Sequence, residues 1–231
     1  MKKSNFKLLL EGWKNYLNEG EEKNIYNQIV KAKSILKNNE KLQIKIYQDS
    51  DDYFELKSHI VDDKNNIVDE VAFIEFEKLH VKKVTDVQGV IRDCFIIHET
   101  NYVNYNLGPL MYDILIEFAS KNNALLVSDR YEVSKDAKVL WNNYLYNRSD
   151  VEKAQLDIDN DDLDKVKFPR LTPQFEDDFY QNFSILDMSV NNLDNWFDSA
   201  FSKGYYKLNT PIIDILTNES EFELIDYTEN N

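Results

Sequence analysis

One turn, over 102–109, holds the residues best suited to binding chemistry; it reads Tyr-Val-Asn-Tyr-Asn-Leu-Gly-Pro. It follows an apolar stretch that predicts a strand over 94–99 and precedes an amphipathic pattern that predicts a helix. The first amides of a helix lack helical acceptors and carry a partial positive charge, so a phosphate fits such a turn. Asn106 and Gly108 best tolerate a positive φ, whereas Pro109 removes one donor. Plain helix initiation is the alternative interpretation.

No metal site is predicted. Three aspartates alternate over 157–162 as in a calcium-binding loop, but its sixth position is Asp162 instead of glycine and its twelfth is Phe168 instead of glutamate. The histidines lack the spacing of a zinc site and are expected to be structural: His59, His80 and His98. The sequence also contains no Walker-type loop, serine nucleophile elbow or Cys/His signature.

Composition predicts a globular protein with an acidic end. The chain has 231 residues, of which 42% are hydrophobic and 13% aromatic, enough for a packed core. Its net charge of −15 argues against general nucleic-acid binding and against anionic membranes. Residues 1–150 hold 21 basic and 24 acidic side chains, whereas 151–231 hold 6 and 18. The C-terminal third therefore suits a basic protein partner.

The sequence favours a reducing compartment. Cys94 is the single cysteine, so no internal disulfide forms, and its position in a strand pattern predicts a buried thiol. The apolar run Leu8–Leu10 is too short for a signal peptide, and no stretch is long enough to predict a membrane span. We expect a cytoplasmic location.

Hydrophobic periodicity predicts mixed α and β elements. Ser134 is expected to cap a helix, and Thr210-Pro211 to begin another. We expect an N-terminal amphipathic arm (1–22), a main domain (23–150), an acidic linker (151–170) and a C-terminal extension packing on the main domain (171–231). The predicted helices are 5–18, 24–38, 109–121 and 134–147; the predicted strands are 41–47, 53–61, 67–79, 94–99 and 124–127, with the first three forming an antiparallel meander.

Meander, strand, turn, helix, strand and helix, in this order over about 41–147, resemble the fold of GNAT-type N-acetyltransferases. The resemblance implies an α+β protein with a mixed, mostly antiparallel sheet flanked by helices. In that family the turn reads Gln/Arg-x-x-Gly-x-Gly/Ala, and its amides hold the pyrophosphate of an acyl-coenzyme A. Gly108 matches this motif, while Asn106 replaces a glycine and Val103 replaces the Gln/Arg.

The resemblance also implies a set of site residues, with acetyl-CoA or another acyl-CoA as cofactor and an unidentified amine as acceptor. The family's last shared helix carries Asn-x-x-Ala-x-x-x-Tyr, whose tyrosine is the general acid; here Trp141 stands in its place, and an indole is no useful acid. The acid role is then lost or passes to Tyr144, and Glu99 or Glu75 would be the general base. The implied cofactor-binding residues are Ile97, Val103, Asn104, Tyr105, Asn106, Leu107, Gly108, Leu110 and Trp141.

Segments over 108–113, 128–134, 137–144 and 148–151 are similar to uncharacterised GNAT-like proteins of tailed phages, as are 202–206 and 210–214. The start of the chain is similar to head-targeting leaders of large phages, which are cut after a triplet such as Leu9-Leu10-Glu11. Two functions stay open. The protein is either a phage-encoded acyltransferase of the host cytoplasm, or a catalytically degenerate GNAT fold that acts as a virion-associated or host-protein-binding acidic protein.

Overall fold

The computed structural model describes residues 19–78, 84–85, 91–129, 133–155 and 199–226. Several predictions lie outside these residues: the N-terminal amphipathic helix, the leader, the calcium-like acidic run, His80 and most of the acidic linker.

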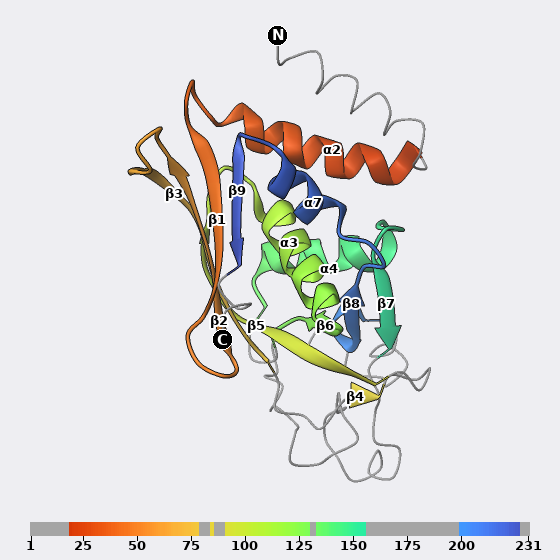
Figure 1. The fold of residues 1–231 in the computed structure, drawn as a ribbon. Helices are drawn as coiled ribbons and strands as arrows, with labels where there is room; N and C mark the ends of the chain where they lie inside the picture. Colours follow the sequence, from red (N-terminus) through yellow and green to blue (C-terminus); the bar gives the residue numbers. More distant parts are fainter. Residues whose placement is uncertain (1–18, 79–83, 86–90, 130–132, 156–198, 227–231) are drawn as a thin grey trace, which may run out of the picture.

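A single mixed sheet organises the described chain, in the strand order β7-β8-β6-β5-β3-β2-β1-β9, with β4 paired to β5 (Figure 1). Neighbouring strands are antiparallel except β5 with β6 and β1 with β9, which are parallel. The predicted α+β class with a mixed, mostly antiparallel sheet is therefore confirmed. The strands are β1 (Lys41–Gln48), β2 (Tyr53–Val61), β3 (Ile67–Lys78), β4 (Val84–Thr85), β5 (Ile91–Val103), β6 (Ala124–Val127), β7 (Glu152–Gln155), β8 (Lys203–Tyr206) and β9 (Phe222–Asp226).

The predicted meander forms β1, β2 and β3. In β2 the side chains alternate between buried and half-buried, which is the period-2 pattern that predicts a strand with one covered face. The turn between β2 and β3 is stabilised by the Asp62 carboxylate, which accepts hydrogen bonds from the backbone amides of Lys64 and Asn66. Asn65 adopts a φ of 62° there, a conformation that asparagine tolerates.

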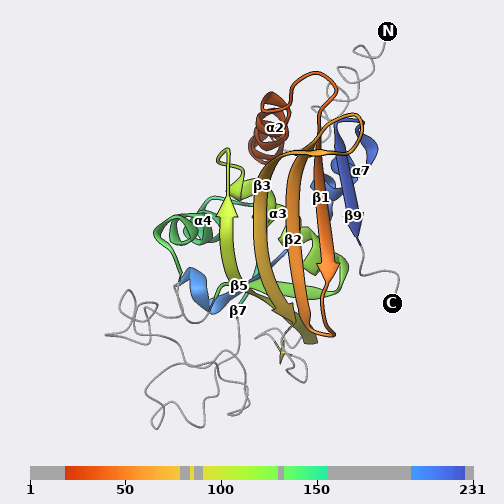
Figure 2. The same ribbon diagram turned by 90° about the vertical axis from the view of Figure 1, so that its left-hand side faces the viewer.

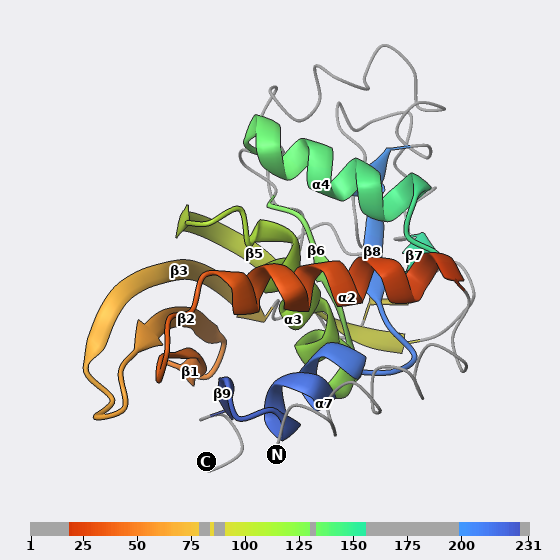
Figure 3. The same cartoon turned by 90° about the horizontal axis from the view of Figure 1, so that it is seen from above.

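All helices that cover β1, β2 and β3 lie on one face of the sheet, and Figure 2 shows the other face without a helix. From above, α2 runs across the top of α3, and α7 lies alongside (Figure 3). The helix α3 is buried on all sides, from Leu110 to Ala119. The helices are α2 (Glu19–Ser34), α3 (Gly108–Lys121), α4 (Lys135–Tyr146) and α7 (Pro211–Asn218), with a 3-10 turn, η3 (Ala200–Ser202).

Two predicted helix starts are confirmed. The Ala137 amide donates to the Ser134 hydroxyl, which caps α4, and α7 begins at Pro211. The C-terminal strands were not predicted: β8 lies between β6 and β7, and β9 pairs with β1 at the other edge. The C-terminal segment is thus part of the sheet itself at both ends.

Candidate functional site

The parallel pairing of β5 with β6 stops part of the way along β5. Their pairing runs from Asp93 with Ala124 to Ile96 with Val127, where β6 ends. β5 continues to Val103 and stays paired with β3 on its other side. Residues 97–103 therefore continue beyond the end of the partner strand, and we call this edge of β5 the splay.

The sequence analysis named two residues of the turn after β5 as best able to adopt a positive φ, and one of them does so. Asn106 has a φ of 53°, as expected, and Tyr105 shares this conformation with a φ of 58°. Gly108, the other residue best able to adopt a positive φ, does not adopt one, and a Cβ added there would meet nothing within 4 Å. The Asn104 amide donates to the Val71 carbonyl at 2.8 Å, which fixes the turn to β3.

Charges of both signs surround this turn. The Lys31 ammonium, from α2, donates to the Asn106 carbonyl at 2.8 Å and is exposed. Asp69 accepts a hydrogen bond from the Tyr105 hydroxyl, and Glu70 accepts one from Tyr102 at 3.0 Å. The hydrogen bond to Asp69 raises the pKa of Tyr105. An anion bound here would therefore meet one cation and free helix amides, with two carboxylates nearby.

Aromatic side chains line the inner end of the splay. The Tyr112 hydroxyl of α3 lies 3.1 Å from the Thr100 hydroxyl of β5, and burial, with a smaller contribution from Asp129 after β6, raises the pKa of Tyr112. Trp141 packs edge-on against Tyr112 with 5.6 Å between ring centroids, and lies 5.0 Å from Tyr205 of β8. Thr100 itself remains exposed, whereas the rings of Tyr112, Trp141 and Tyr205 are buried.

The two predicted carboxylates lie directly opposite each other, Glu75 on β3 and Glu99 on β5, on the face of the sheet that no described helix covers. Glu75 accepts hydrogen bonds from the Tyr53 hydroxyl and from the Asn101 amide. Burial, together with the Glu75 carboxylate, raises the pKa of Tyr53, so this phenol remains a donor. Glu99 is exposed, two residues beyond the start of the splay.

Tyr144 and Trp141 lie in the core instead of at an accessible surface. Tyr144 is fully buried, and its hydroxyl lies 3.4 Å from the Pro109 carbonyl. Burial and the neighbouring Asp113 raise the pKa of Tyr144 well above its ordinary value. Trp141 is 1% exposed. Both side chains are thus held by packing, and neither faces the open part of the splay.

The remaining residues that the resemblance implies for cofactor binding differ in whether their side chains are accessible. The side chains of Ile97, Leu107 and Leu110 are buried in the main core, and Val103 packs against it half-buried. A ligand along β5 would therefore meet their amide and carbonyl groups. Asn104, Tyr105 and Asn106 are exposed around the turn.

A buried charge cluster was missed at the sequence level. Arg148 binds Asp113 with two hydrogen bonds, of 3.0 and 3.1 Å, and Asp150 with two more, of 2.6 and 2.5 Å. The Lys207 ammonium lies 2.9 Å from Glu117 and 3.6 Å from both aspartates. Three carboxylates thus share two cations in the core, since Asp113 and Glu117 are 0% exposed.

This cluster fastens the C-terminal segment to α3. Glu117 accepts hydrogen bonds from the Ile212 and Ile213 amides, at 3.2 and 2.8 Å, and so caps the start of α7. The Lys207 amide donates to the Ser120 hydroxyl at 2.8 Å. Because the charged groups of this cluster are paired with one another and with backbone amides, we interpret the cluster as structural. The sequence signal that could have revealed this cluster is the four-residue spacing of Asp113 and Glu117 on an otherwise apolar helix.

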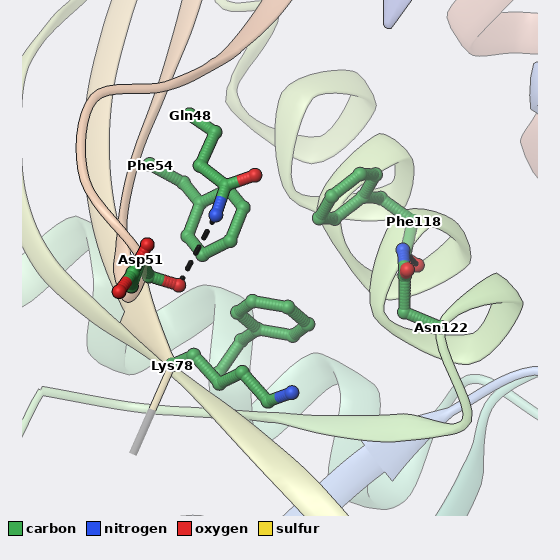
Figure 4. Close-up of a pocket in the computed structure, with 7 residues that line it drawn as sticks. Gln48, Asp51, Phe54, Lys78, Phe118 and Asn122 are labelled. Atoms are coloured by element: carbon green, nitrogen blue, oxygen red, sulfur yellow. Dashed lines mark hydrogen bonds between the residues drawn. The ribbon is translucent and has the colours of Figure 1, made fainter. Parts of the chain in front are cut away.

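A cavity of about 210 Å³ lies at the other end of α3, away from the turn (Figure 4). Its polar rim includes Lys78, whose ammonium is paired with Asp93 at 2.9 Å. The volume is below the range typical of small-molecule sites, so the cavity adds nothing to the coenzyme hypothesis. It is lined by Gln48, Asp51, Phe54, Lys78, Phe95, Phe118 and Asn122.

The described residues contain no group of three or more side chains arranged to hold a metal ion. Within the same residues, no helix has both the length and the apolar character needed to span a membrane. No protein-family model matches the chain, and no curated protein is significantly similar to it.

Proposed function

We propose that the chain is a GNAT-like protein that binds an acyl-CoA along the free edge of β5 and transfers the acyl group to an amine. The observation that carries the proposal is the splay. Parallel pairing stops at Ile96 and Val127, while β5 continues to Val103 and leads into the turn before α3. Among the described residues, no strand pairs with this edge beyond Ile96, and it leads directly to the helix amides, as a ligand with an extended arm and a phosphate end requires.

The order of the elements supports the same proposal. The meander β1–β3 is followed by β5, the turn, α3, β6 and α4, which is the order on which the resemblance to GNAT proteins rests. Asn106 stands where that family has glycine and takes a positive φ, a conformation typical of glycine. Lys31 supplies a cation at the turn, although Val103 replaces the family's Gln/Arg.

Each part of the site has a role in this proposal. Because the Asn104 and Leu107 amides already donate to the Val71 and Asn104 carbonyls, the other backbone amides of 104–108 and the Lys31 ammonium would hold the pyrophosphate, and the edge 97–103 would hold the arm. The bound coenzyme supplies an activated acyl group. Glu99, exposed beside the splay, would accept the amine proton through water, with Glu75 oriented by Tyr53 next to it. Buried Tyr144 has no access to a ligand, so protonation of the leaving group is left to solvent.

Isothermal titration with acetyl-CoA tests binding directly. Wild-type protein is expected to bind saturably in the micromolar range and to gain thermal stability, because a ligand specific for the folded state must raise apparent stability. Lys31→Ala should weaken binding about tenfold, the loss of one charge-assisted contact. Lys37→Ala, which removes an exposed cation just beyond α2, is the matched control. Absence of heat and of stabilisation at millimolar acetyl-CoA would reject the proposal.

A second candidate is a GNAT-like scaffold that no longer catalyses transfer and binds a basic protein. The placement of Tyr144 and Trp141 in the core favours it, because both positions implied for acid catalysis are structural here. The net charge of −15 suits a basic partner. Mass spectrometry of purified phage particles should then detect the protein; its absence from particles would exclude the virion-associated form of this candidate.

A further inference from the structure

The strands β1, β2, β3 and β5 present one face of the sheet that no described helix covers, and we call it the outer face (Figure 2). Side chains alternate between the two faces of a strand, so the core residues of these strands point away from it. Four half-buried aromatic side chains lie on the outer face: Tyr47, Tyr53, Phe73 and Tyr102. Phe73 and Tyr102 meet edge-on, with 6.4 Å between ring centroids.

Three glutamates form a row across the outer face. Glu55 of β2 lies directly opposite Glu75 of β3, which lies directly opposite Glu99 of β5. Neighbouring strands are about 4.8 Å apart, and like charges at directly opposite positions destabilise a sheet. Among the described residues, only Glu55 is paired with a cation, the Lys57 ammonium. The row therefore concentrates negative charge at a cost to stability, an arrangement that is typical of functional surfaces.

Aromatic rings beside carboxylates are favourable surroundings for a cation, and one cation of the chain already uses them. The Lys57 ammonium lies 4.9 Å from the centre of the Phe73 ring and 5.6 Å from that of Tyr47, in addition to its pairing with Glu55. A guanidinium group combines both contacts better than an ammonium does. It is planar, stacks on aromatic rings and donates two parallel hydrogen bonds to a carboxylate.

We propose that the outer face binds an arginine-rich segment of a partner protein, whose guanidinium groups pair with Glu75 and Glu99 and stack on Tyr53 and Tyr102. The Tyr53 hydroxyl donates to Glu75, and Tyr102 lies opposite Phe73, two positions from Glu75 along β3. The net charge of −15 favours the approach of such a partner. This inference rests on the second candidate function, for which it specifies the surface, and it requires no acyl transfer.

Calorimetry with two synthetic peptides of equal charge tests the inference, one of four Arg-Gly repeats and one of four Lys-Gly repeats. Wild type should bind the arginine peptide about fivefold more tightly than the lysine peptide, because only guanidinium groups combine stacking with paired hydrogen bonds. Glu75→Gln/Glu99→Gln should bind the arginine peptide about tenfold more weakly, since two charge-assisted contacts are lost. The melting temperature of this variant should equal or exceed that of wild type, because like charges at opposite positions are removed.

Asp136→Asn/Glu152→Gln is the matched control, because it removes two exposed carboxylates from α4 and β7, outside the outer face. It should change the affinity for the arginine peptide less than about twofold. Equal affinities of wild type for the two peptides, or equal losses in the two double variants, would reduce the binding to general negative charge and overturn the inference. Absence of binding by wild type, or a lower melting temperature of Glu75→Gln/Glu99→Gln with unchanged affinity, would also overturn it. None of these measurements uses acetyl-CoA, so the proposed acyl transfer is judged separately by its own titration, and the scaffold candidate by the particle analysis.

Discussion

The Arg148 guanidinium is 3% exposed and is held by carboxylates from α3 and from the loop after α4. Buried charge is costly unless each ion is paired and its hydrogen bonds are satisfied. Here Asp113 and Asp150 together accept four hydrogen bonds from Arg148. Although burial acts to raise it, the Arg148 contacts hold the pKa of Asp150 below its ordinary value.

Arg148→Met should destabilise the protein by about 3–5 kcal/mol, the cost of leaving a buried partner charge uncompensated. Equilibrium unfolding in urea measures this change in the free energy of unfolding. Lys135→Met, on the exposed start of α4, is the control and should stay within about 0.5 kcal/mol of wild type. Equal effects of the two substitutions would show that the cluster contributes no specific stability.

His59 makes the free energy of unfolding depend on pH. Burial, with smaller effects from Lys45 and Lys57, lowers its pKa below 6.5 even though Glu70 acts in the opposite direction. Between the folded and unfolded pKa values the unfolded chain binds more protons, so the free energy of unfolding rises with pH. The contribution of His59 is therefore complete above about pH 6.5 and is lost as the pH falls through the folded pKa.

His59→Gln should flatten the dependence of the urea midpoint on pH between 7.5 and 5. Proton NMR of the wild-type imidazole should give a titration midpoint below 6.5. A midpoint at or above that value, or an unchanged pH dependence in His59→Gln, would contradict the assignment.

At the scale of the elements, β8 packs tightly between β6 and β7. Gly204 of β8 faces Leu125 of β6, and a Cβ added at Gly204 would lie 2.7 Å from Leu125 Cδ1 and 2.9 Å from its Cβ. Leu125 is 0% exposed. It cannot move away without disturbing the packing around it, because protein interiors are close-packed.

Gly204→Ala should therefore destabilise the protein by about 1–3 kcal/mol, the usual cost of overpacking. Combining it with Leu125→Ala should cost less than the two single substitutions added together, because Leu125→Ala removes the Cγ and Cδ1 atoms that the added methyl group would meet. A double-mutant cycle from urea unfolding measures this coupling. Strict additivity would indicate that the clash is avoided by movement elsewhere.

The sequence predicted the elements that carry their own periodicity and missed those that depend on distant partners. β2 was predicted at its observed bounds, because nine alternating residues form a clear pattern. β7, β8 and β9 have only four or five residues each and include charged residues, so they form neither a readable period nor an apolar run like that of the equally short β6. Their pairing is decided by residues far away in the chain, such as Leu126 with Tyr205.

The same distinction applies to the candidate site. The positive φ of Asn106 follows from a local turn signal, because asparagine is one of the residues best able to adopt it. The facing of Glu75 and Glu99 was not predicted, because it depends on the pairing of β3 with β5. Similarly, Arg148 could not be placed from sequence, because it stands in an Asn-Arg-Ser-Asp sequence that is typical of an exposed loop; only tertiary packing buries it.

At the scale of the whole molecule, the last described strand completes the sheet that the first described strand begins. β9 pairs in parallel with β1, from Leu42 with Phe222 to Ile46 with Asp226. The Lys33 ammonium of α2 pairs with Glu219 and lies 5.7 Å from the centre of the Phe222 ring. The C-terminal segment thus protects an edge of the sheet formed by residues more than 170 positions earlier.

Truncation after Asn218 should remove this protection. It deletes β9 and the 5%-exposed Phe222, so we expect a loss of about 3–5 kcal/mol, comparable to removing a buried aromatic side chain. It also leaves β1 as an unpaired edge with an apolar inner face, which is a template for association. Urea unfolding measures the first effect, and light scattering coupled to size-exclusion chromatography measures concentration-dependent association.

Glu221→Ala is the control, because the Glu221 carbonyl that accepts from the Leu42 amide is retained. A truncated chain that stays monomeric with an unchanged urea midpoint would show that β9 is peripheral, and that the sheet is complete at β1.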